Sequence, residues 1–216
     1  FEATIVFMTV AAEEQGLQGA MHRAQDFKAK GVNVAAMFTN DIVGNTLHED
    51  GTRDRSHVRL FAEGVTVPAV ASGVKELPAD VLAQIRTGGE NDFPPRQLAR
   101  FIQAVGARYV PQLPVKIVYR RDRYLRGGDH SPFLDAGYAA VRFTEPFEVF
   151  ARQHQDVRVE GGVQYGDLPE FVDFAYIAEV ARVNAAALAE RASAPAAPRG
   201  VEIETAKLEN DTTLRW

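Results

Sequence analysis

The sequence contains no cysteine, and this absence narrows the chemistry that the protein can use. Disulfide bonds, thiolate-bound zinc and cysteine nucleophiles are excluded, so histidine and carboxylate side chains would have to hold any metal ion. The chain also lacks an apolar run near the roughly 20 residues of a transmembrane helix. No stretch has the pattern of a secretory signal peptide. The sequence therefore predicts no insertion into a membrane.

Positive charge is also in short supply. Lysine and arginine number 24 against 29 aspartate and glutamate residues, which gives a formal net charge of -5. The densest basic stretch, residues 120–126, is interrupted by Asp122. A protein that binds nucleic acid or an anionic membrane surface usually carries a basic stripe, so neither is expected as a partner.

Two further motifs are missing. The glycine pair at 127–128 lacks the residues of a Walker or dinucleotide fingerprint, which argues against phosphate binding. Ser131 has no histidine and acid at the spacing of a serine hydrolase. Both functional classes are therefore disfavoured.

The sequence does contain an unbroken apolar stretch, residues 4–12, that ends in the adjacent carboxylates Glu13 and Glu14. Such a run predicts a strand buried on both faces, as in a parallel sheet. The pattern that follows predicts a helix over residues 13–30, with Gly31 at its C-terminal cap. Open α/β sheets place their chemistry at the carboxyl ends of strands, which is where this carboxylate pair stands.

A second apolar run, residues 32–40, leads to Asp41. Strand, helix and strand at this spacing predict a βαβ unit with a right-handed crossover, and hence an α/β fold. The remaining patterns predict strands over 57–63, 115–119 and 139–144, helices over 78–85, 96–107 and 170–191, and a short helix capped by Ser131 with Pro132 at its first position.

The composition changes near the end of the chain. Residues 193–200 are rich in alanine and proline, which is typical of a linker. Residues 201–216 then alternate as strands do. We expect residues 1–192 to belong to one domain and residues 201–216 to begin a β-sandwich module of the fibronectin type.

Three acidic or imidazole-bearing points lie at or just after the carboxyl ends of predicted strands: Glu13-Glu14, Asp41 and Asp129-His130. Carboxylate and imidazole are ligands of zinc and similar divalent ions. A neighbouring free carboxylate can act as general base on an attacking water. Each point also has a structural interpretation, because acids favour the first turn of a helix and turns favour aspartate. The residues alone leave a metal site and a set of structural acids as alternatives.

The segments that contain these residues resemble the co-catalytic zinc aminopeptidase family, which includes bacterial leucyl aminopeptidases and aminopeptidase Y. Residues 5–20 are similar to the glutamate-pair motif of that family, residues 33–44 to its metal-binding aspartate strand and residues 128–141 to its late histidine motif. The motifs occur in the order of the family, and the resemblance covers about residues 1–192. It implies a three-layer α/β/α fold with a mixed, mainly parallel sheet, of which this chain holds the C-terminal portion.

The resemblance also implies roles for individual residues. Glu13 would be the general base, Glu14 and His130 would bind one zinc ion, and Asp41 would bind the other. The substrates would be peptides. Arg123, Tyr124 and Arg126 precede the histidine motif and could line the substrate cleft, although a structural role is also open. The other histidines, His22, His48, His57 and His154, match no motif and are interpreted as surface residues.

One departure from the family concerns the start of the chain. The family places a further histidine and a bridging aspartate before the glutamate pair, and residues 1–12 contain neither. We therefore expect a segment of a longer, exported enzyme that is itself inactive or weakly active, with at most one weakly held zinc ion. Missing neighbouring strands would leave an uncovered edge, which predicts self-association.

Two alternatives remain open. Glutaminyl cyclases are acyltransferases that share the fold and use a single zinc ion, for which Glu14, Asp41 and His130 would suffice. A non-catalytic interaction domain is the other, although such relatives usually lose the motif residues that are intact here. Metal stoichiometry and product analysis of the full-length protein would separate the cyclase from the peptidase.

Overall fold

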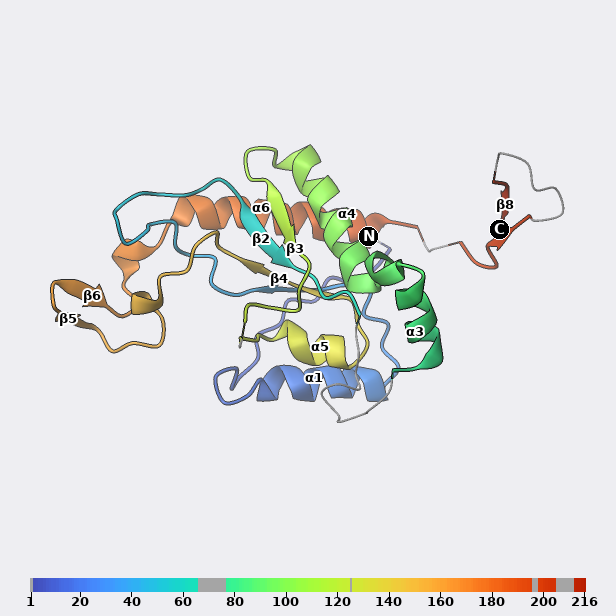
Figure 1. The fold of residues 1–216 in the computed structure, drawn as a ribbon, viewed down its shortest axis with the longest axis horizontal. Helices are drawn as coiled ribbons and strands as arrows, with labels where there is room; N and C mark the ends of the chain where they lie inside the picture. The colour runs from blue at the N-terminus through green and yellow to red at the C-terminus, as the bar shows by residue number, and fades with distance from the viewer. Residues whose placement is uncertain (1, 66–76, 125, 196–197, 205–211) are drawn as a thin grey trace.

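A mixed four-stranded sheet lies between two layers of helices in the computed structural model (Figure 1). The structure describes residues 2–65, 77–124, 126–195, 198–204 and 212–216. The sheet has the strand order β1-β4-β2-β3, with β1 at Met37–Asn40, β2 at Val58–Phe61, β3 at Val115–Val118 and β4 at Ala140–Thr144. The pairs β1–β4 and β2–β3 are parallel, and β2–β4 is antiparallel. The expected three-layer α/β fold with a mainly parallel sheet is confirmed.

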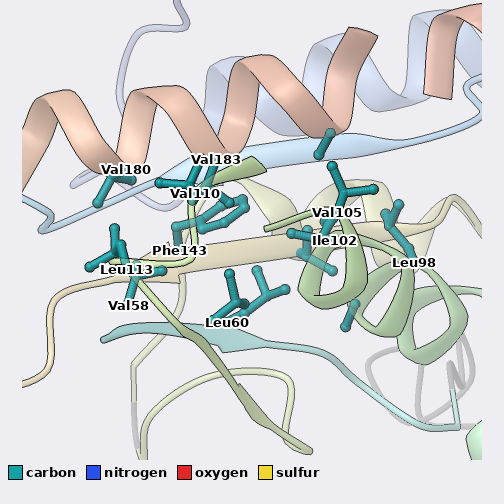
Figure 2. Close-up of a cluster of buried hydrophobic side chains, with 14 of the residues drawn as sticks. Val58, Leu60, Leu98, Ile102, Val105, Val110, Leu113, Phe143, Val180 and Val183 are labelled. Atoms are coloured by element: carbon teal, nitrogen blue, oxygen red, sulfur yellow. The ribbon is translucent and has the colours of Figure 1, made fainter. Parts of the chain in front are cut away.

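Helices α4 (Pro94–Tyr109) and α6 (Phe174–Ser193) cover one face of this sheet. Pro94 and Pro95 open α4, two residues before the predicted start at residue 96, because the first turn of a helix does not need the amide hydrogens that proline lacks. Figure 2 shows the apolar side chains of the two helices pointing toward the strands. This cluster is the main core, and its fully buried members include Val58, Leu60, Ile102, Val141, Phe143 and Val183.

Helices α1 (Gln18–Ala29) and α5 (His130–Asp135) cover the opposite face. The core on this side is smaller, and it consists of Ala20, Ala24, Phe133, Leu134 and Ala140. Small alanines let α1 approach α5 closely. The lower apolar content of this face leaves room for the polar residues that are described below.

Shorter elements complete the fold, namely α3 (Ala79–Arg86), η1 (Gly89–Asp92), η2 (Phe150–Arg152), β5 (Arg158–Glu160), β6 (Val163–Tyr165), η3 (Pro169–Phe171), β7 (Glu202–Ile203) and β8 (Leu214–Arg215). The β5–β6 hairpin was not predicted, although its Gly161-Gly162 turn is a recognised hairpin signal. Strands β7 and β8 pair antiparallel, in keeping with the alternation there. That they begin a β-sandwich stays a prediction, as does the linker, part of which lies outside the described residues.

The strand predicted over residues 4–12 is wrong for this structure. Most of these residues are exposed, with Val6 65% and Phe7 89% accessible to solvent. Within the described residues no strand pairs with this segment, and the ordered sheet begins at β1. A strand needs a neighbour for its backbone hydrogen bonds, so an apolar sequence alone did not suffice. The predicted βαβ unit is consequently not formed.

Other differences concern element boundaries. The strand predicted over residues 32–40 is limited to the four residues of β1. The helix predicted from residue 13 begins only at Gln18, because Gly16 and Leu17 have positive φ angles of 103° and 62°. Asp129, and not Ser131, occupies the N-cap of α5. No helix in the described part of the chain is both long enough and apolar enough to cross a membrane.

Candidate active site

Glu13 and Glu14 lie in a tight turn that connects residues 4–12 to α1. The carbonyl of Glu13 accepts hydrogen bonds from the backbone amides of Gly16 and Leu17, at 3.0 and 2.8 Å. The amide of Gly19 bonds the carbonyl of Ala11 at 3.0 Å, and a Cβ at Gly19 would lie 2.5 Å from that oxygen. Glycine at this position is therefore required for the turn to close, and the turn holds both glutamates before the helix and not in its first turn.

Asp41 follows β1 directly, as predicted. The next residue, Ile42, has a φ of 59°, a left-handed conformation that a β-branched residue rarely adopts. The other non-glycine residues with positive φ in the described chain are Ala12, Leu17 and His154. Three of these four lie next to Glu13, next to Asp41, or in contact with Glu14. Backbone strain of this kind concentrates at functional sites, so its distribution supports the predicted location.

His130 is completely buried at the start of α5. Its Nε2 lies 2.8 Å from the carbonyl oxygen of Arg121, and because a carbonyl can only accept, Nε2 carries the hydrogen. Nδ1 then holds the lone pair, and this buried atom has no hydrogen-bond partner among the described residues. Burial lowers the pKa of His130 to about 4, although the Arg121 carbonyl and Asp122 oppose that shift. The imidazole is therefore neutral at physiological pH, the form that binds metal ions.

Gly128 separates Asp41 from His130. A Cβ on this glycine would lie 3.1 Å from Oδ2 of Asp41 and 3.4 Å from Nδ1 of His130. The two donor atoms thus face a space that any side chain at this position would fill. A carboxylate oxygen and an imidazole lone pair are donor types that zinc prefers, so these two residues supply part of a metal ligand set.

Three carboxyl groups gather on this rim, those of Glu13, Asp41 and Asp129. Burial raises the pKa of Glu13, and the nearby carboxylates of Asp41, Glu14 and Asp129 raise it further. Burial is also the main cause of the raised pKa of Asp41, against the opposing effect of Arg142, and it raises the pKa of Asp129 together with the charge of Asp41. Like charges in partial burial repel each other, so the rim favours a proton or another cation.

Glu14 is directed elsewhere. Its side chain is 65% exposed and its Oε1 lies 3.6 Å from Nδ1 of His154. Within the described residues, no three histidine, aspartate or glutamate side chains are grouped closely enough to hold a metal ion. The structure therefore brings Glu13, Asp41 and Asp129 together beside His130, but it does not assemble Glu14, Asp41 and His130 into a ready ligand set. Their assignment as ligands stays a prediction.

Arg142 and Asp122 are site residues that the sequence reasoning missed. Arg142 is fully buried on β4, and its Nη2 lies 2.9 Å from Oδ2 of Asp41. Its Nη1 lies 2.5 Å from Oδ1 of Asp122, which is also buried. A lone arginine inside the apolar strand Ala-Val-Arg-Phe-Thr was the available signal, because a buried charge needs a buried partner.

The three residues proposed for the substrate cleft differ in their surroundings. Arg123 is engaged in ion pairs with Asp122 and Glu148, and its side chain is only 14% exposed, which favours the structural interpretation. Tyr124 is 78% exposed, and the guanidinium of Arg126 lies 5.9 Å from the ring centre of Phe150. Of the three, Tyr124 and Arg126 are exposed, and their place in a substrate cleft stays a prediction.

Two hollows were found elsewhere along the described chain. One of about 570 Å³ follows β3 and includes Ser56, His57 and Tyr119. Another of about 380 Å³ lies at His48, Phe147 and Glu148. Neither is lined by the predicted site residues.

Comparison with known proteins gives consistent matches. The sequence model described as "Peptidase family M28" matches residues 1–165. A protein of Leptosphaeria maculans and one of Pyricularia oryzae, both named probable zinc metalloproteases, are each 50% identical to this chain over 99% of its length. The chain spans 48% and 42% of these two relatives, less than half of each.

Solved structures share the fold at low sequence identity. The LapA aminopeptidase of Legionella pneumophila superposes with a TM-score of 0.54 at 17% identity, over 87% of this chain and 38% of LapA. An aminopeptidase from Aneurinibacillus sp. strain AM-1 gives a TM-score of 0.50 at 17% identity, over 85% of this chain and 32% of that protein. At this identity the likeness establishes the zinc exopeptidase type of fold and nothing finer.

Proposed function

Because this chain belongs to peptidase family M28, we propose that the protein is a zinc-dependent aminopeptidase, which hydrolyses the amino-terminal residue from peptides. The names of the relatives support zinc and proteolysis, and those of the distant structural neighbours support the aminopeptidase type. The observation that carries the proposal is the placement of Asp41 and His130 around Gly128, with Glu13 beside them.

Asp41, His130 and Glu14 would hold the metal. The side chain of Glu14 would have to turn from His154 toward the rim, which its exposure permits. When bound, zinc polarises the scissile carbonyl and lowers the pKa of a water molecule. Proton transfer and substrate orientation would be carried out by residues of the chain.

Glu13 is suited to accept and return a proton. A general base works best when its pKa approaches the working pH, and burial together with three neighbouring carboxylates raises the pKa of Glu13. In the proposed reaction its carboxylate takes a proton from the attacking water and gives it to the leaving amine.

The acidic rim also favours one end of a peptide. Glu13, Glu14, Asp41 and Asp129 surround the site with negative charge. A substrate with a free ammonium group would be attracted to this rim, whereas a carboxylate would be repelled. The charge of the rim thus supports an aminopeptidase over a carboxypeptidase.

The test compares hydrolysis of an aminoacyl anilide by the protein and by Glu13→Gln. Loss of the base should lower the rate by about 10²–10⁴-fold, while zinc binding is retained. Glu160→Gln is the matched control, because that glutamate is 67% exposed on the β5–β6 hairpin and should leave the rate unchanged. Equal rates for Glu13→Gln and the control would contradict the proposal.

Substrate ends provide a second test. Acetylation of the substrate amine should abolish cleavage, and equal cleavage of a blocked peptide would contradict an aminopeptidase. Cyclisation of a peptide with N-terminal glutamine would point to an acyltransferase instead. We expect this chain by itself to turn over weakly, since its described residues offer no preassembled group of three metal ligands.

A further inference from the structure

Arg142 occupies the centre of the sheet. It stands opposite Thr39 of β1 and Phe61 of β2, and its side chain is fully buried. Side chains alternate along a strand, and Ala140 belongs to the cluster under α1 and α5. Arg142 therefore points to the α1/α5 face, toward the candidate site. A guanidinium in this place is tolerated only if its charge and its hydrogens are matched by buried partners.

Two carboxylates balance its charge, the buried Asp122 and the partly exposed Asp41, while its Nε has no hydrogen-bond partner among the described residues. Nη2 of Arg142 lies 2.9 Å from Oδ2 of Asp41, and Nη1 lies 2.5 Å from Oδ1 of Asp122. The second contact anchors the guanidinium, because Asp122 is itself held by the backbone amide of Arg123 at 2.7 Å. Arg142 thus fixes Oδ2 of Asp41, the same oxygen that faces Gly128 and His130.

The loop after β3 connects the same arrangement to His130. The carbonyl of Arg121 accepts the hydrogen of His130 Nε2, and Oδ2 of Asp122 lies 3.6 Å from that nitrogen. Two successive loop residues therefore set the imidazole, while the second of them also holds Arg142. Asp41 and His130 belong to different elements, and this loop and Arg142 are what join them.

We propose that Arg142, anchored by Asp122, is a positioning residue that fixes the Asp41 carboxylate relative to His130 for metal binding. The inference rests on the proposed function only in that it needs zinc to bind at Asp41. Outer partners of metal ligands set the orientation of those ligands, and their removal typically weakens metal binding by about 10–100-fold. Lysine cannot replace arginine here, because only a planar guanidinium reaches two carboxylates at once.

The experiment measures zinc affinity by competition with a chromophoric chelator for the whole chain and for Arg142→Met, Arg142→Lys and Asp122→Asn. Arg59→Met is the matched control, because Arg59 pairs with the buried Glu148 at 2.8 Å on the neighbouring strand β2. Cobalt absorption spectra report the ligand geometry independently of activity. Thermal unfolding without metal shows how much each variant destabilises the fold.

We expect Arg142→Met to weaken zinc binding by about 10–100-fold and to change the cobalt spectrum. The zinc affinity of Arg142→Lys should lie between those of Arg142→Met and the parent protein. Arg59→Met should be less stable but should keep the zinc affinity and cobalt spectrum of the parent. If Arg142→Met does not fold, the test rests on Arg142→Lys and the isosteric Asp122→Asn. Both must then bind zinc more weakly than the parent protein.

Equal zinc affinities for the Arg142 and Arg59 variants would overturn the positioning role, and so would a parent chain that binds no zinc. The two proposals fail in different ways. A protein that binds zinc and loses it on substitution of Arg142, but that cleaves blocked and free peptides equally or cyclises N-terminal glutamine, would retain the positioning role and refute the aminopeptidase.

Discussion

The two faces of strand β4 perform different tasks. Val141 and Phe143 point to α4 and α6 and belong to the main core, where apolar contacts leave no charge to be matched. Ala140 and Arg142 point to α1 and α5, where a buried guanidinium meets acids from two other elements. One strand therefore stabilises the fold with one face and organises the candidate site with the other.

The buried acids of the molecule show the same contrast. Burial raises the pKa of Asp173, which stands at the N-cap of α6. Hydrogen bonds from Arg55, Thr46 and the amide of Tyr176 more than offset this effect, so the pKa is lowered. The pKa values of Asp41 and Asp129 on the rim are raised. Asp173 accepts hydrogen bonds from three residues, whereas Asp41 is paired with Arg142 and the buried Oδ1 of Asp129 has no partner among the described residues. Asp173 therefore stabilises the protein, whereas the acids of the rim remain available for chemistry.

The largest effect on stability is expected on the α4/α6 face. Phe143→Ala removes a fully buried ring that lies 5.8 Å from the ring of Phe38. Loss of contacts and the resulting cavity should lower the free energy of unfolding by about 3–5 kcal/mol in urea titrations. Phe7→Ala is the control, because Phe7 is 89% exposed, and a comparable loss there would contradict the contrast.

A smaller effect on stability should come from the ionisation of Glu145, which lies just after β4. Burial raises the pKa of this carboxyl to about 8, although a hydrogen bond from the amide of Asn45 opposes the shift. Between its unfolded pKa of 4.5 and the folded value, the native state binds more protons than the unfolded state. Stability should therefore fall as the pH rises through this window, by about 2–4 kcal/mol.

Glu145→Gln cannot ionise and should flatten this dependence, as measured by urea unfolding at several pH values. The amide keeps an acceptor for the Asn45 backbone, so the variant should gain stability at neutral pH. An unchanged pH profile would show that Glu145 does not retain its proton in the folded protein.

The acids of scaffold and rim should respond in opposite directions to the same substitution. Asp173→Asn removes the charge from the α6 cap and should lower stability by about 1–2 kcal/mol at neutral pH. The stabilising effect of Asp173 itself is present above its unfolded pKa of 3.8 and is lost as the pH falls through its lowered folded value. Asp129→Asn relieves repulsion and should leave stability unchanged or raise it by up to about 1 kcal/mol. A loss of equal size in both variants, measured by thermal unfolding, would remove the distinction.

The smallest effect on stability concerns residues 4–12, whose apolar side chains face solvent. We expect this surface and the open edge of β1 to drive self-association, because exposed apolar segments and unpaired edges tend to pair with other chains. Phe7→Ser should reduce the average mass in light scattering without changing the unfolding midpoint. A parent protein that stays monomeric over a wide concentration range would contradict the expectation.

Part of the site was predictable from sequence. Glu13, Asp41 and His130 each stand at the end of an apolar run or beside a glycine turn, and such positions are visible in a one-dimensional pattern. Arg142 and Asp122 were not found, since their importance depends on a contact between residues 20 positions apart in different elements. The orientation of Glu14 toward His154 is likewise set by a loop that sequence analysis placed at the surface.

By itself the sequence determined the α/β class, the helices α3, α4 and α6, and strands β2 to β4, because hydrophobic periodicity and proline at a helix start act over a few residues. Only the tertiary structure decided that residues 4–12 remain unpaired, which nitrogen of His130 carries the lone pair, and that Arg142 binds Asp41. These outcomes depend on which backbone and side-chain groups meet across the fold. Local preference can predict an element, but the pairing of strands and buried charges requires a partner from elsewhere in the chain.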